Sequence, residues 1–430
     1  MLTATVISVI TCLFMVLAVL VLPQIKVGKV CISSYWLVTL AGAAVLLFVG
    51  CIDIASLGVA LVADTAINPV KILVLFISMT ILSIFLDELG FFRYLANIAL
   101  SRAGTSQKRL FMLLYVTVSI LTVFTSNDII ILSFTPFICY FAKNAKISPM
   151  PFLAAEFVAA NTWSMALIIG NPTNVYLATA TGSDFVSYMK VMLPVTLVSG
   201  IVAFAFLYML FREKLSDPIQ ANPEAVAIED KVSLGLGIAH LAVCTIMLAI
   251  GSYIGVEMWL VSFVSVISLF IFSIVISLFR AKKLTALSSC LKRAPWELIP
   301  FVISMFVMVE ALTATGVTNE IFHLLSGDLP IWKYGASSFL VANVINNIPM
   351  SVLYSSILAN TTSQGAVFAT VIGSNLGACL TPIGALAGIM WSSILKEHSL
   401  KFGYTDFLKI GVVVGIPALA GALGILQLVL

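Results

Sequence analysis

The sequence predicts an all-α, polytopic membrane protein with two inverted repeats, paired re-entrant hairpins and broken helices, in about 10–12 membrane segments. Three observations lead to this prediction: the composition, the length of the apolar runs and the placement of Lys and Arg. Of the 430 residues, 61% are hydrophobic and 10% are charged, whereas a soluble domain carries roughly 25% charged residues. Too few polar groups remain to cover a water-facing surface, so lipid must surround most of the chain.

The apolar runs have the length of membrane-spanning helices, which need about 20 residues. They begin near Leu2, Ser34, Lys71, Phe111, Pro151, Val191, Ser233, Glu257, Trp296, Gly335, Gly365 and Phe407. Because the backbone in lipid must satisfy its own hydrogen bonds, these runs are helices unless buried irregular backbone interrupts them. The first run lacks a basic n-region and a small-residue cleavage site, so we interpret it as a retained membrane helix.

The placement of Lys and Arg predicts the orientation. If the N-terminus is outside and apolar pairs that begin and end on one side are re-entrant hairpins, all but three of the 22 Lys and Arg residues fall on one face. The exceptions are Lys71, Lys190 and Lys333. By the positive-inside rule the rich face is cytoplasmic. This predicts a multi-pass protein of the cell inner membrane with both termini extracytoplasmic, one hairpin around Asn127 entering from the cytoplasm and another around Asn347 entering from outside.

The chain also divides into two similar halves. We predict a first repeat over 1–212, a cytoplasmic linker over 213–232 that contains Pro218 and Pro223, and a second repeat over 233–430. Three features recur in the same order in both halves. They pair Gly90 with Gly316, Asn127 with Asn347, and Asn161 with Asn375.

The broken helices predict a binding pocket near the middle of the membrane. Polar residues in an apolar run are costly in lipid unless they face a cavity or lie at a hairpin tip. At a tip, free N–H groups and a helix N-terminus suit an oxyanion, whereas amide carbonyls and a carboxylate suit a cation. Alternatively, each Asn caps a buried helix end, and each interruption is only a kink. The predicted substrate-binding residues are Ser126, Asn127, Asn161, Thr162, Asn171, Asn174, Asn346, Asn347, Asn375 and Thr381.

Acidic residues within the membrane segments are candidates for proton or cation coupling. Asp128 is the first candidate, because it lies at a predicted hairpin tip. Glu156 and Glu310 are either further members of a relay or partners of buried hydroxyl or backbone groups. Asp87 and Glu88 are expected at the membrane interface instead.

The same segments limit the ligand and exclude other classes of protein. None of the four pocket segments carries a basic residue, which favours a neutral or singly charged ligand, or an anion accompanied by sodium. The cysteines are scattered singly and only three His exist, so no metal site and no cofactor are predicted. Neither an enzyme nor a nucleic-acid partner is expected. Because a GxxxxGK[ST] loop is absent, any use of ATP must come from a partner.

Several motifs resemble one known family. They are Leu86–Phe92, Asn127-Asp128 with Thr135-Pro136, Ala294-Pro295-Trp296, Asn346-Asn347 with Pro349, and Val371–Ser374 continuing to Leu380–Gly384. On these motifs the chain resembles the arsenite efflux permeases, a family within a superfamily of ion transporters. That superfamily also includes sodium-coupled dicarboxylate carriers, citrate–metal carriers and a class of sodium/proton antiporters. Gly170–Asn174 looks more like the carboxylate and sodium/proton branches.

This resemblance implies secondary active transport. It implies proton-driven export of arsenite or antimonite by elevator-like alternating access, with a small inorganic oxyanion or neutral metalloid hydroxide as substrate. Such permeases also dock a soluble ATPase subunit in some systems. Where that branch is expected to carry an acid, this chain has Asn161 and Asn375. This departure keeps open a sodium-coupled carboxylate carrier, a sodium/proton antiporter, and a channel or pump subunit.

Overall fold

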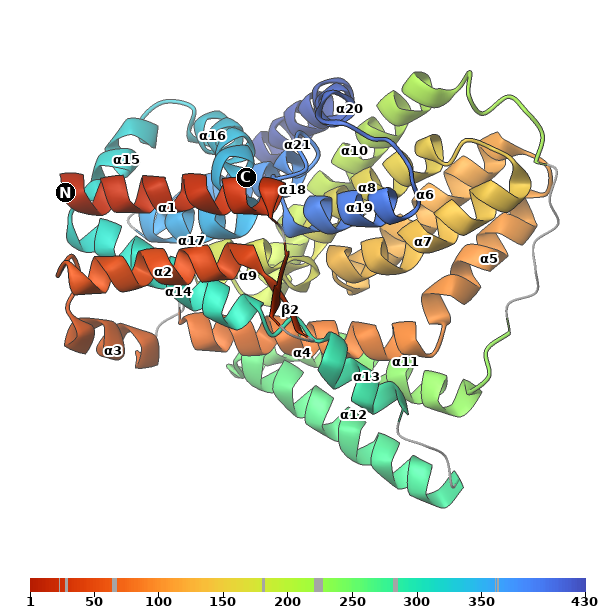
Figure 1. Ribbon diagram of the computed structural model, residues 1–430, viewed down its shortest axis with the longest axis horizontal. Helices are drawn as coiled ribbons and strands as arrows, with labels where there is room; N and C mark the ends of the chain where they lie inside the picture. The colour runs from red at the N-terminus through yellow and green to blue at the C-terminus, as the bar shows by residue number, and fades with distance from the viewer. Residues whose placement is uncertain are drawn as a thin grey trace.

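The computed structural model describes residues 1–22, 24–27, 30–63, 68–179, 182–219, 227–280, 285–359, 361 and 363–430. The described part is almost entirely helical (Figure 1). Its first half comprises α1 (Leu2–Val21), β1 (Gln24–Val27), β2 (Val30–Ser33), α2 (Ser34–Phe48), α3 (Ile54–Val62), α4 (Pro69–Glu88), α5 (Phe91–Ala103), α6 (Gln107–Phe124), α7 (Asn127–Ala145), α8 (Met150–Trp163), the 3₁₀ turns η1 (Ser164–Ala166) and η2 (Ile168–Gly170), α9 (Pro172–Thr179) and α10 (Phe185–Phe211).

The second half continues the helical pattern. It comprises α11 (Lys231–Ile254), α12 (Met258–Arg280), α13 (Thr285–Arg293), α14 (Leu298–Ala314), α15 (Val317–Leu325), α16 (Pro330–Ile345), α17 (Asn347–Leu358), α18 (Gln364–Gly377), α19 (Leu386–Glu397), α20 (Tyr404–Ile410), a π-helical stretch η3 (Gly411–Gly415) and α21 (Ile416–Val429). Of the predicted linker, residues 220–226, Pro223 among them, lie outside the described residues, and the division of the chain at 213–232 stays a prediction.

The helices have the length and composition of membrane spans. Within the described residues, eight helical segments are long and apolar enough to cross a bilayer, and α2 is a shorter apolar helix. Many of their large apolar side chains are exposed, such as Phe14, Phe48 and Phe279. In water such surfaces would aggregate, whereas in lipid they need no cover. The predicted polytopic helical membrane protein is therefore confirmed.

Local sequence explains where the long helices begin and end. The Asn68 side chain accepts hydrogen bonds from the N–H groups of Val70 and Lys71 and so caps α4, with Pro69 in the first turn. At the other end, Gly90 has φ +78°, a conformation open to glycine because it lacks Cβ. The chain thereby turns directly from α4 into α5.

Two helical hairpins interrupt the bundle, α6–α7 and α16–α17. In Figure 1 the first lies in the right half of the molecule and the second in the left half. The turn into α17 places Asn346 at φ +72° and ψ 153°, a region that only glycine adopts without strain. The tip of the second hairpin is therefore a conformationally constrained point of the fold.

The order of elements after each hairpin is also similar. The α8 helix leads into η1, η2 and the short α9, and likewise α18 leads through a non-helical turn into α19. Close packing accompanies the second break, because a side chain at Gly373 would collide with the Ser338 hydroxyl and the Gly335 carbonyl of α16. Glycine is thus required where α16 and α18 touch.

One element was not predicted. Between α1 and α2 the chain forms a two-stranded antiparallel ribbon, in which Gln24 pairs with Ser33 and Val27 with Val30. β-Branched residues alternate there with polar ones, which favours a strand over a helix. The prediction of a wholly α-helical chain missed this ribbon, because it rested on apolar runs of about 20 residues and each strand has only four.

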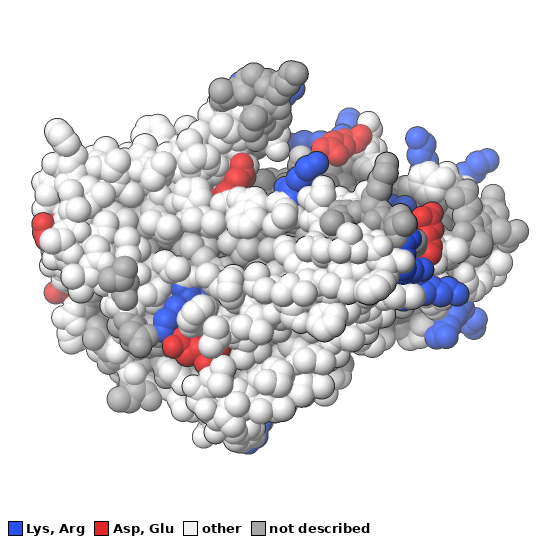
Figure 2. Space-filling model, turned by 90° about the horizontal axis from the view of Figure 1, so that it is seen from below, with Lys and Arg blue, Asp and Glu red and all other residues white. Residues whose placement is uncertain are grey.

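On the face drawn in Figure 2, many of the Lys and Arg side chains lie toward the right-hand end, and others lie near the centre and left. Figure 1 places the N-terminus at the left. The orientation of the chain in the membrane stays a prediction.

Candidate functional site

A buried network of amide side chains joins the two halves of the chain. Its centre is Asn375 in α18, whose side chain is fully buried. Its Oδ1 accepts hydrogen bonds from Ser164 Oγ at 2.9 Å and from Asn171 Nδ2 at 3.0 Å. Its Nδ2 donates to Asn174 Oδ1 at 2.7 Å and to the Val371 carbonyl at 2.8 Å. Residues about 200 positions apart in the sequence thus share one polar cluster.

The break after α8 makes this contact possible. The Asn174 Nδ2 donates to the carbonyls of Ser164 (2.8 Å) and Leu167 (3.1 Å), which the 3₁₀ turns leave outside a regular helix. The Asn171 Oδ1 accepts from the N–H of Thr173 at 3.2 Å, directly after Pro172. The amides therefore satisfy the backbone groups that a broken helix exposes in the membrane.

The tip of the first hairpin lies against α8. Asn127 Nδ2 donates to Asn161 Oδ1 at 3.2 Å, and Asn161 Nδ2 donates to the Phe157 carbonyl at 2.8 Å. Two buried hydroxyls in this region, Ser126 Oγ and Thr162 Oγ1, have no hydrogen-bond partner among the described residues. A buried hydroxyl without a partner costs about 1–3 kcal/mol, so a ligand that bonds to it gains affinity.

The tip of the second hairpin lies against the break after α18. Asn346 Nδ2 donates to the Ile383 carbonyl at 2.8 Å, and the N–H of Asn347 donates to the Gly384 carbonyl at 3.0 Å. Thr381 Oγ1 donates to Asn343 Oδ1 at 2.6 Å. Asn343 escaped the sequence analysis, although its position one helical turn before Asn347 was a usable signal.

The predicted substrate-binding residues are all buried, with exposed fractions of 3% or less. Hydrogen bonds bring together Asn127 with Asn161, and Asn375 with Asn171 and Asn174. Among the described residues no hydrogen bond joins the two hairpin tips to each other. Ser164, a further member of the network, was missed, since a serine in a membrane helix is unremarkable without its partner.

The three predicted coupling acids occupy different positions. Asp128 lies in the first turn of α7, directly after Asn127, and is half-buried. Glu156 is buried, and the single Thr135 hydroxyl donates to its carboxylate, with Oγ1 2.8 Å from Oε1 and 3.1 Å from Oε2. Glu310, in α14, has no hydrogen bond or ion pair to a described residue. Of the two roles considered for Glu156, a relay member or the partner of a buried hydroxyl, this contact with Thr135 is the one expected for the second.

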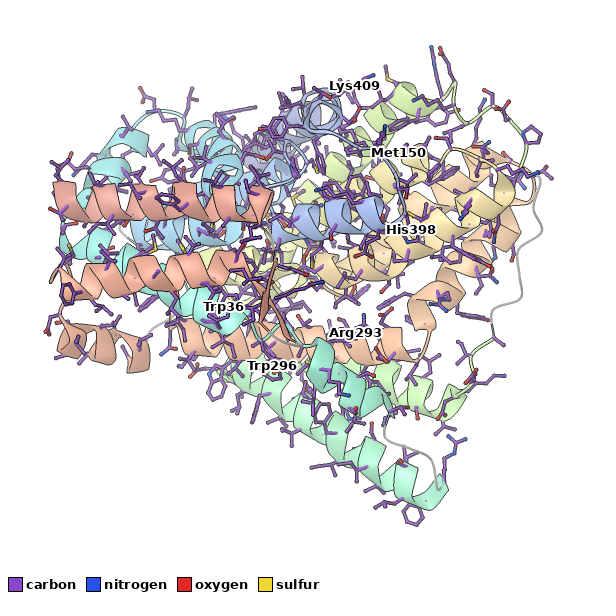
Figure 3. The ribbon with its side chains drawn as sticks, in the orientation of Figure 1. Trp36, Met150, Arg293, Trp296, His398 and Lys409 are labelled. Carbon is purple, nitrogen blue, oxygen red and sulfur yellow. The ribbon has the colours of Figure 1, made fainter. Side chains whose placement is uncertain are left out.

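A charged cluster missed by the sequence analysis also links the halves. Arg293, labelled at the end of α13 in Figure 3, pairs with Asp87 at 2.7 Å and with Glu88 at the end of α4. The Ser133 hydroxyl of α7 donates to the same Asp87 carboxylate. Arg293 stands directly before Ala294-Pro295-Trp296, and that proximity to a recognised motif was the available signal.

Within the described residues, no group of three or more His, Cys, Asp or Glu side chains is arranged to hold a metal ion. The network is instead rich in amides and hydroxyls. Such groups both donate and accept hydrogen bonds, so they suit a ligand with several hydroxyls or carbonyls.

Comparison with known proteins places this arrangement in a family. A family model described as "Citrate transporter" matches residues 18–370. The chain belongs to this citrate transporter family. Its membership confirms the resemblance to the superfamily that contains citrate carriers, and it identifies the chain as a membrane transporter.

Individual proteins that are similar to this chain carry different names. The chain is 26% identical over 373 residues to the "Arsenical pump membrane protein" of Escherichia coli strain K12, which covers 82% of this chain and 85% of the relative. It is also 26% identical over 372 residues to the "46 kDa membrane protein" of Mycobacterium leprae, covering 81% of this chain and 84% of that protein.

A solved structure shares the fold. The crystal structure of the Alcanivorax borkumensis YdaH transporter, described as having an unusual topology, aligns with 99% of this chain and 98% of its own. The TM-score is 0.58 at 13% sequence identity. The transporter fold is thus shared although few residues are.

Proposed function

We propose that this member of the citrate transporter family is a secondary active transporter that exports arsenite or antimonite, driven by protons. Its substrate is a small inorganic oxyanion or neutral metalloid hydroxide, which binds where the hairpin tips meet the broken helices. The two halves act as inverted repeats, and the part that carries the hairpins moves relative to the remaining helices in an elevator-like cycle. Both termini are extracytoplasmic in this proposal.

The observation that carries the proposal is the neutral, cross-half network around Asn375. A neutral metalloid hydroxide presents several O–H groups and lone pairs but no charge to balance. Amides and hydroxyls match it, whereas a multiply charged carboxylate placed there would lack a cationic partner. The unpartnered Ser126 and Thr162 hydroxyls provide further bonding groups beside the network.

Proton coupling is assigned to Asp128. It stands at the N-terminus of α7, next to Asn127, so protonation there alters the charge at the tip that contacts α8. Glu156 is less suited to this task, because the Thr135 hydroxyl lies against both of its oxygens in the buried core. A soluble ATPase subunit is a further proposed partner, as the resemblance to the arsenite efflux permeases implies.

A sodium-coupled carboxylate carrier or sodium/proton antiporter is the second candidate. Two observations favour it: the family model is described as a citrate transporter, and neutral Asn161 and Asn375 occupy positions where the arsenite branch is expected to carry acids. With sodium bound, amide and backbone oxygens together with one carboxylate neutralise part of a substrate's charge.

Transport by reconstituted protein separates the two candidates. Proteoliposomes are supplied with arsenite, citrate or succinate under an imposed pH gradient or an imposed sodium gradient, in separate arms. Arsenite movement driven by the pH gradient alone supports the proposal. Carboxylate movement that requires sodium, with no arsenite flux, refutes it and supports the second candidate. A conductance that does not saturate and shows no counterflow indicates a channel.

Two variants test the assigned residues. Asp128→Asn is expected to abolish gradient-driven flux while counterflow exchange and the elution profile stay unchanged. The matched control is Asp53→Asn. This change removes an exposed carboxylate that caps α3, an element distant in sequence from Asp128. Asn127→Ala combined with Asn347→Ala is expected to abolish substrate binding, and retained binding would show that the hairpin tips are only helix caps.

A further inference from the structure

A second polar site lies outside the network of amides around Asn375, between α4, α5, α11 and α12. A cavity of about 530 Å³ is lined by the end of α4, the start of α5, the start of α11 with the residues just before it, the last turns of α12 and the start of α13. The α12 helix, at the bottom of Figure 1, diverges from α4 toward its C-terminal end. None of the residues assigned to transport above lines this cavity.

The face of α12 that lines the cavity is polar. Ser273, Ser277 and Arg280 follow one another at helical spacing and all line the cavity. On the outer face Leu278 and Phe279 are 76% and 88% exposed, as expected for residues that face lipid. Polar residues on the inner face of such a helix need a polar neighbour in the membrane.

Most charges of the cavity are already paired. Arg280 contacts Asp230 at 2.8 Å, and Glu88 pairs with Arg293. Arg93 and Glu229 line the same cavity and are exposed. Among the described residues, neither Arg93 nor Glu229 has an ion pair, so the described lining holds one positive and one negative side chain without a charged partner.

Two further observations point to a ligand with a phosphate. The α5 helix is 13 residues long, and no side chain caps its N-terminus at Gly90, which lines the cavity with Arg93. Such an N-terminus binds anions through its free N–H groups and the helix dipole. Independently, Ser273 lines the same cavity and is 8% exposed, and its buried hydroxyl has no partner among the described residues.

We propose that this cavity binds the headgroup of a zwitterionic aminophospholipid from the surrounding bilayer. Its phosphate lies at Arg93 and the N-terminus of α5, its ammonium lies toward Glu229, and the Ser273 hydroxyl bonds to an ester or phosphate oxygen. The acyl chains leave the cavity toward the surrounding lipid. One available charge of each sign selects a headgroup that carries both, over an anionic headgroup of the same size.

Lipid retention by the purified full-length protein tests this assignment. The protein is exchanged into detergent with equal amounts of phosphatidylethanolamine and phosphatidylglycerol, and bound lipid is quantified by native mass spectrometry. Wild type is expected to retain the ethanolamine lipid over the glycerol lipid. An interfacial basic residue contributes about 1 kcal/mol to lipid binding, so Arg93→Gln is expected to lower retention about fivefold.

Glu229→Gln is expected to abolish the preference between the two lipids while phosphate-dependent retention persists. The control is Arg102→Gln, at the far end of the same α5 helix and outside the cavity lining, which is expected to change nothing. Because all three side chains are exposed, the fold is expected to tolerate these changes, and an unaltered elution profile checks this. The exchanged pair Arg93→Glu with Glu229→Arg is expected to recover part of the retention.

Equal retention in wild type and Arg93→Gln would overturn the proposal. So would a preference for phosphatidylglycerol that Glu229→Gln leaves unchanged. A separate arm adds glycerol 3-phosphate and inorganic phosphate as competitors. If these displace all bound lipid at millimolar concentration, the site takes a soluble phosphate rather than a lipid headgroup, and the assignment to the bilayer is wrong.

Discussion

Replacing Asn375 by alanine is the most informative test of the network between the halves. The change removes four hydrogen bonds, to Ser164, Asn171, Asn174 and the Val371 carbonyl. Three of these partners belong to the first half of the chain. Asn375→Ala is therefore expected to loosen the contact between the halves as well as α18 itself.

The magnitude follows from what each partner loses. Interhelical hydrogen bonds in membranes average about 0.6 kcal/mol, so the three bonds that leave α18 amount to about 2 kcal/mol. In addition, Asn171 Nδ2 loses its side-chain acceptor, and Asn174 Oδ1 keeps only a long 3.5 Å contact with Thr173. A stranded buried polar group costs about 1–3 kcal/mol. The Ser164 hydroxyl keeps its bond to the Asn161 carbonyl. Because the cost of stranding these two groups already includes the bonds that they lose, we expect a total loss of about 2–6 kcal/mol in the free energy of unfolding.

The measurement is unfolding of the purified protein by SDS titration in mixed micelles, alongside flux in proteoliposomes. Thr370→Val is the matched control, because Thr370 is equally buried in α18 but its hydroxyl bonds only to the Ala366 carbonyl of the same helix. We expect the control to lose about 1 kcal/mol or less and to retain flux. If Asn375→Ala were no less stable than Thr370→Val, the network would not hold the halves together and the reasoning would be refuted.

Three further perturbations have expected outcomes. Gly373→Ala places a methyl group against the backbone of α16 and should destabilise by about 1–3 kcal/mol, whereas Gly424→Ala, with open space around it, should not; equal SDS midpoints would contradict the packing argument. Arg293→Gln leaves the two carboxylates at the end of α4 without their cation, and about 1–3 kcal/mol should be lost; a midpoint within error of wild type in low salt would count against it. Lys71→Gln breaks a 2.6 Å pair with the half-exposed Glu257, and the loss should stay below about 1 kcal/mol; a larger loss would mean that this pair is shielded from solvent.

Much of the fold was predictable because lipid acts on local properties of the chain. The runs that begin near Leu2, Ser34 and Lys71 correspond to α1, α2 and α4, since the length of an apolar run and its backbone hydrogen bonding are decided within one segment. The breaks at Pro172 and at Asn346-Asn347 were visible for the same reason, because polar and helix-breaking residues stand out in an apolar run.

The site was predictable only as a set of residue types. Amides at the hairpin tips and breaks indicated a polar pocket, yet which amides touch was not readable from spacing. The pairing of Ser164 with Asn375, and of Arg293 with Asp87, joins positions more than 200 residues apart.

The sequence by itself therefore determined the membrane environment, the approximate place of the long apolar helices and the polar interruptions. Only the tertiary structure decided that Asn375 accepts from the first half, that Asn343 bonds to Thr381 and that Ser126 and Thr162 lack partners. The physical reason is range. Hydrophobic length and backbone hydrogen bonding are satisfied within a helix, whereas a buried amide takes its partner from whichever segment the packing of the whole bundle brings within 3 Å.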